Sequence, residues 1–233
     1  MKSAVPASHH TTDVSDRASR RSRPHDLLQH PAAKPLLFVI CLLPFGWLFH
    51  AAWADTLGAN PAEALIRILG DWTLRFLCLT LAVTPLRQLT GWASLARFRR
   101  MLGLFTYCYV WLHFLAYGWL DKGLDFADIL TDIAKRPFIL VGTLGLLLLT
   151  PLALTSFNRA IRTLGARRWQ WLHRLIYPIA LLGLLHFFWM RAGKNDFAEV
   201  AIYAVVIGAL LAWRIGRVIT LRLRSQAAGS TAR

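Results

Sequence analysis

The stretch RRWQWLHRLIYPIALLGLLHFFW, residues 167–189, decides the fold class of this chain. After its first basic residues it stays almost entirely apolar, and about 20 such residues are enough to cross the roughly 30 Å of hydrocarbon in a bilayer. It also contains His173 and His186, whose polar rings would have no water to bond at membrane depth. Ionisable side chains inside a membrane usually belong to a functional site, so this stretch predicts a span and a site together.

The rest of the sequence repeats this pattern. The 233 residues are 56% hydrophobic and yet carry a net charge of +15, so apolar and charged residues must occupy separate segments. Six apolar runs are expected to be membrane spans: 36–53, 72–86, 101–120, 138–157, 172–190 and 197–213. A lone span in lipid can satisfy its backbone hydrogen bonds only as a helix. The sequence therefore predicts an all-α membrane protein, a bundle of six transmembrane helices.

Prolines predict local features of these helices. Pro137 suits the first turn of the fourth helix, where a missing backbone N–H costs nothing. Pro44, Pro151 and Pro178 fall inside runs. They predict kinks, because a proline inside a helix removes one hydrogen bond and crowds the carbonyl of the preceding turn.

Basic residues orient the bundle. With the N-terminus in the cytoplasm, twenty of the 27 Lys and Arg residues fall on cytoplasmic segments and seven on outer segments. Cytoplasmic loops are enriched in Lys and Arg, so both termini are expected in the cytoplasm. Nine of the twelve Asp and Glu residues fall on the outer side. The net charge thus reflects topology, and no nucleic-acid partner is needed to explain it or expected. The basic cytoplasmic loops are expected to attract anionic membrane lipid.

Three regions follow from this pattern. Residues 1–34 lack a packable apolar set and are expected to be a disordered, basic cytoplasmic tail. Residues 35–217 form the six-helix domain, and residues 218–233 a basic cytoplasmic C-terminal tail. Cys41, Cys78 and Cys108 lie far apart within spans and are expected to pack as small apolar residues. The sequence contains no Walker, GxGxxG or GxSxG motif, so nucleotide or serine-hydrolase chemistry is not expected.

Depth separates the histidines of the predicted spans, which are His50, His113, His173 and His186. Any one of them could simply hydrogen-bond a neighbouring helix. The third and fifth helices run in the same direction, and His113 and His186 lie about 18 and 21 Å from the inner face at 1.5 Å per residue. Two level imidazoles on parallel helices are suited to be axial ligands of a flat metal macrocycle.

The position of His173 stays open. It lies near the inner edge, and the thirteen residues that separate it from His186 place the two about 140° apart on an ideal helix. Pro178 lies between them and could bend or re-phase the helix, which would bring both onto one face.

Five sequence blocks point to a known family. They are LLPFGWL, VTPLRQL, RFRRMLGLFTYCYVWLHFLAY, RPFILVGTLGLLLLTPLALTS and LGARRWQWLHRLIYPIALLGLLHFFW. Over about residues 36–220 the chain resembles the ferric-reductase-like transmembrane family. The resemblance is strongest to the haem-binding membrane subunits of periplasmic systems that reduce methionine sulfoxide in proteins.

The resemblance implies b-type haem bound by histidines of the third and fifth helices. Larger relatives carry two histidines on each of these helices, whereas the third helix here has only His113, and Arg99 and Arg100 stand where the other would be expected. One haem between His113 and His186 is therefore the main hypothesis, and a second haem bound by His173 is an open alternative. His50 is outside the family pattern and is expected to be structural.

Two further roles are expected from the resemblance. Relatives are associated with FMN, and Arg99 and Arg100 form a cationic cytoplasmic edge that could bind a flavin phosphate. They could equally be ordinary positive-inside arginines. Arg75 could pair with a haem propionate or extend to the outer interface.

A haem with both axial positions filled by protein has no open site for substrate, so an electron-transfer subunit is expected rather than a catalytic one. Electrons would come from the quinone pool or from a cytoplasmic flavin reductase. The resemblance implies a periplasmic molybdopterin reductase as acceptor and the bacterial inner membrane as location. The acidic outer loop 120–137 is either a docking surface or a solvated connector.

Two other functions stay open. A self-contained ferric reductase or oxidase would generally continue into a FAD and nicotinamide domain, and only about 20 residues follow the sixth span, so an external reductase would be needed. A transporter or scaffold with structural histidines would bind no haem.

Overall fold

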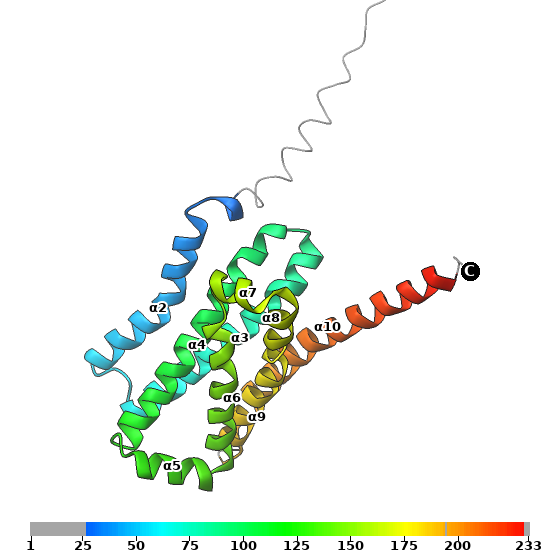
Figure 1. Ribbon diagram of the computed structural model, residues 1–233. Helices are drawn as coiled ribbons and strands as arrows, with labels where there is room; N and C mark the ends of the chain where they lie inside the picture. Colours follow the sequence, from blue (N-terminus) through cyan, green and yellow to red (C-terminus); the bar gives the residue numbers. More distant parts are fainter. Residues whose placement is uncertain (1–26, 194, 231–233) are drawn as a thin grey trace, which may run out of the picture.

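The computed structural model describes residues 27–193 and 195–230, with side chains described through residue 226. Within these ranges the chain is helical and has no strand (Figure 1). The helices are α2 (Ala33–Trp53), α3 (Pro61–Thr90), α4 (Arg99–Ala116), α5 (Phe126–Lys135), α6 (Pro137–Leu154), α7 (Asn158–Leu164), α8 (Ala166–His173), α9 (Ile176–Ala192) and α10 (Ala198–Ser230). A 3₁₀ turn, η1 (Ala93–Phe98), precedes α4, and a π turn, η2 (Tyr117–Asp121), follows it. Most of the predicted tail 1–34 lies outside the described residues.

Five helical segments are long and apolar enough to cross a membrane: Ala33–Trp53, Ala93–Asp121, Pro137–Leu154, Ala166–Ala192 and Ala198–Gln226. They contain the first, third, fourth, fifth and sixth predicted runs apart from a few end residues. Large apolar side chains on their outer faces are open, and Phe49, Leu147 and Val205 are 65%, 62% and 71% exposed. Such a surface is typical of a protein solvated by lipid.

The second predicted run, 72–86, lies in α3, which is not among these five segments. This 30-residue helix begins eleven residues before the run and carries Glu63, Arg67, Asp71 and Arg75 in its first half. It packs against α2, α4 and α10, and its second half contributes many of the most buried apolar residues. Because neighbouring helices cover it, α3 can carry charged groups that a lipid-facing span could not.

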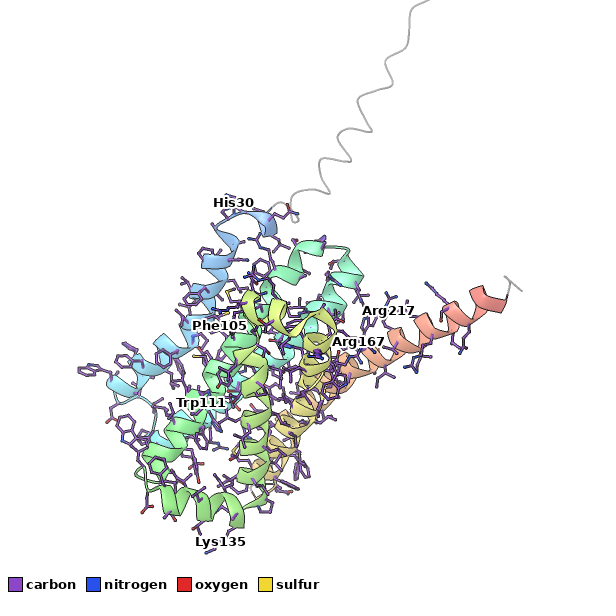
Figure 2. All side chains as sticks on the ribbon, in the orientation of Figure 1. His30, Phe105, Trp111, Lys135, Arg167 and Arg217 are labelled. Carbon is purple, nitrogen blue, oxygen red and sulfur yellow. The ribbon has the colours of Figure 1, made fainter. Side chains whose placement is uncertain are left out.

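Charge divides the bundle into two ends. The acidic end holds α5, the start of α3 and the turn between α9 and α10, and the nine described Asp and Glu residues belong to segments near it (Figure 1). The basic end holds η1, α7 and α8, which supply arginines such as Arg97 and Arg167. Figure 2 shows Lys135 and His30 at these opposite ends. Helix α10 continues past the predicted boundary at 217, so the tail 218–233 is helical as far as Ser230.

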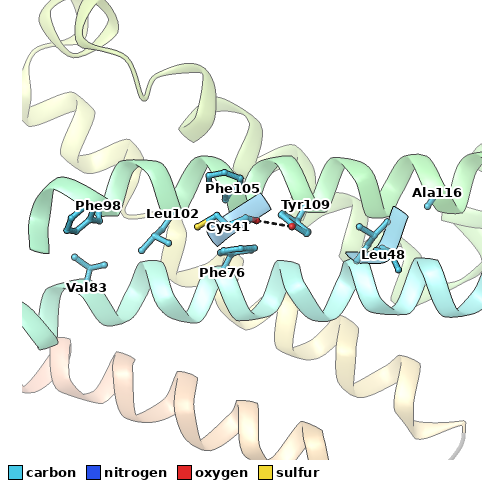
Figure 3. Close-up of a cluster of buried hydrophobic side chains, with 10 residues drawn as sticks. Cys41, Leu48, Phe76, Val83, Phe98, Leu102, Phe105, Tyr109 and Ala116 are labelled. Carbon is cyan, nitrogen blue, oxygen red and sulfur yellow. Dashed lines mark hydrogen bonds between the residues drawn. The ribbon is translucent and has the colours of Figure 1, made fainter. Parts of the chain in front are cut away.

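A tyrosine hydroxyl repairs the backbone beside Pro44 in α2. Tyr109 of α4 accepts a hydrogen bond from the Phe45 N–H at 3.0 Å and donates one to the Cys41 carbonyl at 3.0 Å (Figure 3). These two groups are four residues apart and would be helical partners in a regular helix. The hydroxyl therefore bridges the helix at the proline, and Tyr109 is only 1% exposed.

An arginine performs the same task in α3. Pro85 has no N–H for the carbonyl of Leu81, and the Arg214 guanidinium of α10 donates to that oxygen at 2.9 Å. Arg214 also lies over the Tyr177 ring, at 5.2 Å from its centroid. A charged residue of the sixth span is thus used inside the bundle, because lipid offers no other donor to the orphaned carbonyl.

The fifth predicted span is interrupted next to Pro178. The proline lies in the first turn of α9, and the helix breaks at Arg174 and Leu175, between α8 and α9. The backbone passes through this break with i→i−3 bonds, such as Tyr177 N–H to the Arg174 carbonyl at 3.1 Å. The carbonyl of Arg174 is the group that Pro178 cannot satisfy, so the break lies one turn before the proline.

Aromatic rings pack α2, α3 and α4 together beside the tyrosine bridge. Phe76 of α3 lies 4.9 Å from Tyr109 and 5.8 Å from Phe105, measured between ring centroids. Phe38 of α2 lies 5.3 Å from Phe105. This cluster fixes α4, and with it the position of His113.

We expect Tyr109→Phe to destabilise the protein although it keeps the aromatic ring. It would leave the Phe45 N–H and the Cys41 carbonyl without their partner, at a cost of about 1–3 kcal/mol. The thermal unfolding midpoint in detergent should fall. Tyr107→Phe is the control, because its hydroxyl makes one longer bond, of 3.4 Å, to Thr150. Equal midpoints for the two variants would contradict the bridge.

Candidate functional site

A cavity of about 560 Å³ lies between α3, α4, α6 and α9. Its volume is in the range typical of sites for small molecules and cofactors, roughly 300–1,000 Å³. Its walls are mainly apolar, with Leu74, Leu77, Val110, Leu146 and Leu149 among them. Charged residues line the part that faces the acidic end.

His113 of α4 and His186 of α9 both line this cavity. Their ring centroids are 6.1 Å apart and their planes cross at 82°. The structure therefore brings these two rings close together, at one cavity. A metal–imidazole nitrogen bond is about 2.0–2.1 Å long, so this spacing suits two imidazoles that share one metal ion.

Backbone carbonyls fix both rings in the same way. His113 Nδ1 lies 2.8 Å from the Ile66 carbonyl of α3, and His186 Nδ1 lies 2.7 Å from the Phe138 carbonyl of α6. A carbonyl can only accept, so each Nδ1 carries the proton and each Nε2 keeps its lone pair. Orientation of a metal-binding histidine by such a bond is the usual arrangement around metal sites.

A glycine beside each carbonyl makes room for the imidazole. A Cβ on Gly70 would lie 3.1 Å from His113 Cε1, and a Cβ on Gly142 would lie 2.8 Å from His186 Nδ1. Each glycine follows its carbonyl residue by four positions, Ile66 to Gly70 and Phe138 to Gly142. Helices α3 and α6 therefore supply the same device, one accepting oxygen and one missing side chain on a single helix face.

The donor set favours a macrocycle over a bare metal ion. In the described part of the chain no group of three or more His, Cys, Asp or Glu side chains could hold a metal. Two imidazoles complete the coordination only of a metal whose other positions are filled, as they are in a haem. The apolar walls suit the faces of such a ring.

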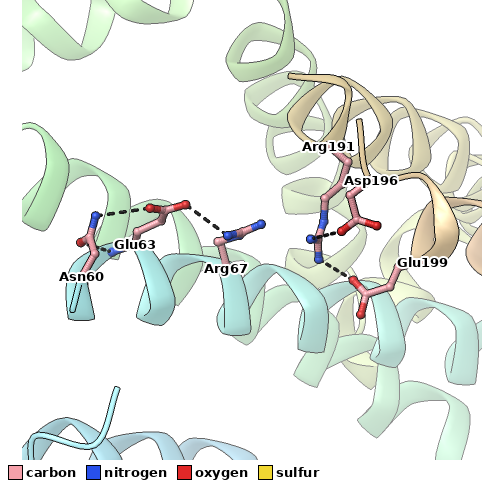
Figure 4. A network of polar contacts seen from close by, with 6 residues as sticks. All are labelled: Asn60, Glu63, Arg67, Arg191, Asp196 and Glu199. Atoms are coloured by element: carbon pink, nitrogen blue, oxygen red, sulfur yellow. Dashed lines mark hydrogen bonds and ion pairs between the residues drawn. The ribbon is translucent and has the colours of Figure 1, made fainter. Parts of the chain in front are cut away.

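Arginines that were not singled out from the sequence line the mouth of the cavity. Arg67 of α3 and Arg136, just before α6, both contribute to the lining, together with Tyr117. Arg67 is paired with Glu63 at 3.2 Å, and Figure 4 shows this pair close to the Arg191, Asp196 and Glu199 cluster. Carboxylates of Glu63, Asp71 and Asp121 line the same cavity, and Arg136 pairs with Asp132 at 2.9 Å, so the mouth carries charges of both signs.

Arg75 lies elsewhere. Its guanidinium stacks over Trp72 at 4.7 Å and borders a groove between α2 and α3, and it is not among the residues that line the histidine cavity. Arg67 and Arg136 are therefore better placed than Arg75 to meet a carboxylate inside that cavity.

His173 is also separate from the cavity. It ends α8 at the basic end, stacks on Trp169 with ring centroids 3.9 Å apart, and its Nδ1 lies 3.1 Å from the Trp169 carbonyl. Its Nε2 is buried and has no partner among the described residues. The break between α8 and α9 therefore does not bring His173 into the cavity that His186 lines.

The remaining predicted residues lie apart from the histidine pair. Arg99 and Arg100 begin α4 at the basic end, and Arg100 donates to Asn158 of α7 at 2.9 Å. His50 is exposed on α2. Neither arginine lines the cavity.

Known proteins show the same sequence pattern. The model of the ferric reductase like transmembrane component matches residues 69–184, which include His113 and His173. A protein-methionine-sulfoxide reductase heme-binding subunit MsrQ from Polaromonas naphthalenivorans is 69% identical, covering 81% of this chain and 86% of its own length. The chain belongs to the MsrQ family. It is an integral, multi-pass membrane protein.

Further members of the MsrQ family give the same match. The MsrQ of Herminiimonas arsenicoxydans is 52% identical, covering 78% of this chain and 84% of its own length. The MsrQ of Ralstonia nicotianae is 53% identical, covering 79% and 85%. No solved structure matches the chain.

We expect Gly142→Ala to displace the His186 imidazole, because the new Cβ would lie 2.8 Å from its Nδ1. Haem is the group expected at this site from the sequence, and its content per chain is the measurement. Changes to groups that orient a metal ligand typically lower metal affinity roughly 10–100-fold. Gly208→Ala in α10 is the control, since nothing lies within 4 Å of its Cβ position and it does not line the cavity. Gly70→Ala should fall between the two.

Proposed function

We propose that this chain is the haem-binding, electron-carrying membrane subunit of a methionine sulfoxide reductase system. The main support is the pair His113 and His186, whose rings lie 6.1 Å apart in an apolar cavity. The Nδ1 of each ring donates a hydrogen bond to a backbone carbonyl. Relatives named as heme-binding subunits of protein-methionine-sulfoxide reductase support the assignment.

The residues of the cavity fit a b-type haem. His113 and His186 would hold it through Nε2, and when bound it would supply reversible one-electron chemistry. The hydrogen bonds at Nδ1 fix the imidazole tautomer and raise the basicity of Nε2. At the cavity mouth, Arg67 and Arg136 would share their charge between their present partners, Glu63 and Asp132, and a haem carboxylate, and the apolar walls exclude water.

The topology belongs to the same proposal. In this proposal the chain crosses a bacterial inner membrane six times, and α3 is one of the crossings. The basic end of the bundle and both termini would lie in the cytoplasm, and the acidic end would lie in the periplasm. The separation of the described carboxylates from η1, α7 and α8 supports this orientation. Residues 35–217 form the membrane domain, flanked by cytoplasmic segments 1–34 and 218–233.

Electrons would enter from the quinone pool or from a cytoplasmic flavin reductase and leave at the acidic end. The acceptor would be an MsrP-like periplasmic molybdopterin reductase that repairs oxidised methionine. FMN would bind at the basic end through Arg99 and Arg100, which begin α4 beside α7. A second haem, if present, would use His173, whose Nε2 is buried without a partner among the described residues.

We expect His113→Ala and His186→Ala each to remove the haem Soret absorption of the purified protein, because one remaining imidazole cannot complete the coordination. His50→Ala is the control, since His50 is exposed and outside the cavity. Pyridine haemochrome quantitation should give one haem per chain. Two haems, with one lost in His173→Ala, would assign the second to His173.

Haem content and electron-transfer assays separate the other functions. A colourless wild-type protein would contradict the carrier and favour a transporter or scaffold. A haem protein that reduces ferric ions with a soluble reductase but passes no electrons to a methionine sulfoxide reductase would favour the ferric reductase.

We expect the double variant Arg99→Gln, Arg100→Gln to release FMN while it keeps haem. A hydrogen bond to a charged group contributes about 1.5–3 kcal/mol, so the affinity for FMN should fall roughly 10–100-fold for each such hydrogen bond that the variant cannot make. Flavin released by acid and measured by fluorescence gives the content per chain. Arg159→Gln on α7 is the control, because it removes one exposed charge from the same end. Equal flavin in all variants would contradict this site.

A further inference from the structure

Helix α5 lies crosswise at the acidic end of the bundle, between α4 and α6 (Figure 1). It contains ten residues, Phe126–Lys135, between η2 and α6. Asp125 caps its first turn by accepting from the Ala127 and Asp128 N–H groups at 2.9 and 3.1 Å. A helix in this position runs parallel to the membrane plane when the bundle spans the bilayer.

Three faces of α5 differ in chemistry. Ile129 and Asp132 are buried against the bundle. At 100° per residue, Phe126 and Leu130 lie on the adjacent edge, and they are 78% and 67% exposed. Asp128, Thr131 and Lys135 share the opposite, polar face. Two large apolar side chains are therefore open on a helix whose polar residues already face away from them.

The open edge of α5 is flanked by further exposed apolar side chains. Trp119 of η2 and Leu124 are 68% and 52% exposed. Leu115 near the end of α4 and Leu140 near the start of α6, both exposed, belong to the spans themselves. The segments that enter and leave α5 thus belong to membrane-crossing helices that carry exposed apolar side chains at the ends next to α5.

Ion pairs hold α5 in this rotation. Asp132 accepts from Tyr117 at 2.7 Å and pairs with Lys122 at 3.2 Å and Arg136 at 2.9 Å. Burial tends to raise the pKa of the Asp132 carboxyl, but the hydrogen bonds from Tyr117 and Lys122 and the charge of Arg136 hold it below its usual value. With Asp132 fixed beneath the helix, Phe126 and Leu130 cannot turn inward.

We propose that α5 is an interfacial helix, seated in the lipid headgroup region with Phe126 and Leu130 directed to the acyl chains. Amphipathic helices with Phe, Trp and Leu on one face insert about 5–10 Å into this boundary. Lipid is the occupant that the structure favours over a protein, because α5 directly connects two membrane-crossing segments, Ala93–Asp121 and Pro137–Leu154, whose exposed apolar side chains the bilayer covers. The interfacial position of α5 does not depend on haem binding. Only the assignment of α5 to the periplasmic leaflet rests on the orientation given under the proposed function.

This seat would also support the histidine site. Arg136 follows α5 directly and lines the cavity, and Phe138, two residues later, supplies the carbonyl that binds His186. Tyr117, which bonds Asp132, lines the same cavity. A helix fixed both by the bilayer and by Asp132 would hold this wall of the cavity in place.

The test places a fluorophore on each face of α5 in lipid nanodiscs. Cys41 and Cys78 are buried, so Cys108→Ser gives a background without an accessible native thiol. Phe126→Cys and Leu130→Cys report the apolar edge, and Asp128→Cys and Thr131→Cys report the polar face. Phosphatidylcholine with a nitroxide on the upper acyl chain is the quencher.

We expect quenching at 126 and 130 to be several-fold stronger than at 128 and 131. A soluble quencher such as iodide should give the reverse order. Equal weak quenching by lipid at all four positions, with strong quenching by iodide, would overturn the proposal and leave the edge available to a protein partner. The thermal unfolding midpoint of every variant shows whether the bundle is intact, and because it does not require haem, it keeps this result separate from the proposed function.

Discussion

The structure depends on one constraint, which is that a polar group inside a bilayer must find its partner within the protein. In α2 and in α3, a proline deprives a carbonyl or an N–H of its usual bond. Tyr109 bridges the first of these sites and Arg214 supplies the second. Both donors come from another helix, so the repairs also fix how α4 meets α2 and how α10 meets α3. The places where prolines interrupt α2 and α3 are thus also places where a neighbouring helix is bound.

The histidine pair obeys the same constraint, but here the polar side chains need partners and the helix backbones supply them. His113 and His186 bring the polar atoms, and the backbones of α3 and α6 bring the acceptors. Gly70 and Gly142 allow the rings to approach these backbones closely enough. Each imidazole then presents its second nitrogen to an apolar cavity, where a metal is a better partner than water. The site is symmetrical in design although it is built from four different helices.

Charge distribution connects this site to its surroundings. The described carboxylates gather at one end of the bundle, and there they pair with arginines that include two at the mouth of the cavity. At the other end, arginines of η1, α7 and α8 have no carboxylates near them in the described sequence. One end is therefore electrostatically complete within the chain, whereas the basic end calls for anionic lipid or another anion. Helix α5 closes the first end, where Asp132 ties it to the residues that line the cavity.

The sequence by itself determined the helical class, five of the spans, the opposing charges of the two ends and the depth of His113 and His186. These features follow from hydropathy and from a fixed rise per residue, which are local properties. Only the tertiary structure decided that the two imidazoles share a cavity, that Arg67 and Arg136 rather than Arg75 border it, and that His173 lies outside it. Rotation of a helix about its axis and the place of a break, such as that at Arg174 and Leu175, depend on which neighbour satisfies each polar group. The paired spacings from Ile66 to Gly70 and from Phe138 to Gly142 were present in the sequence, but their meaning appears only when a histidine of another helix packs against them.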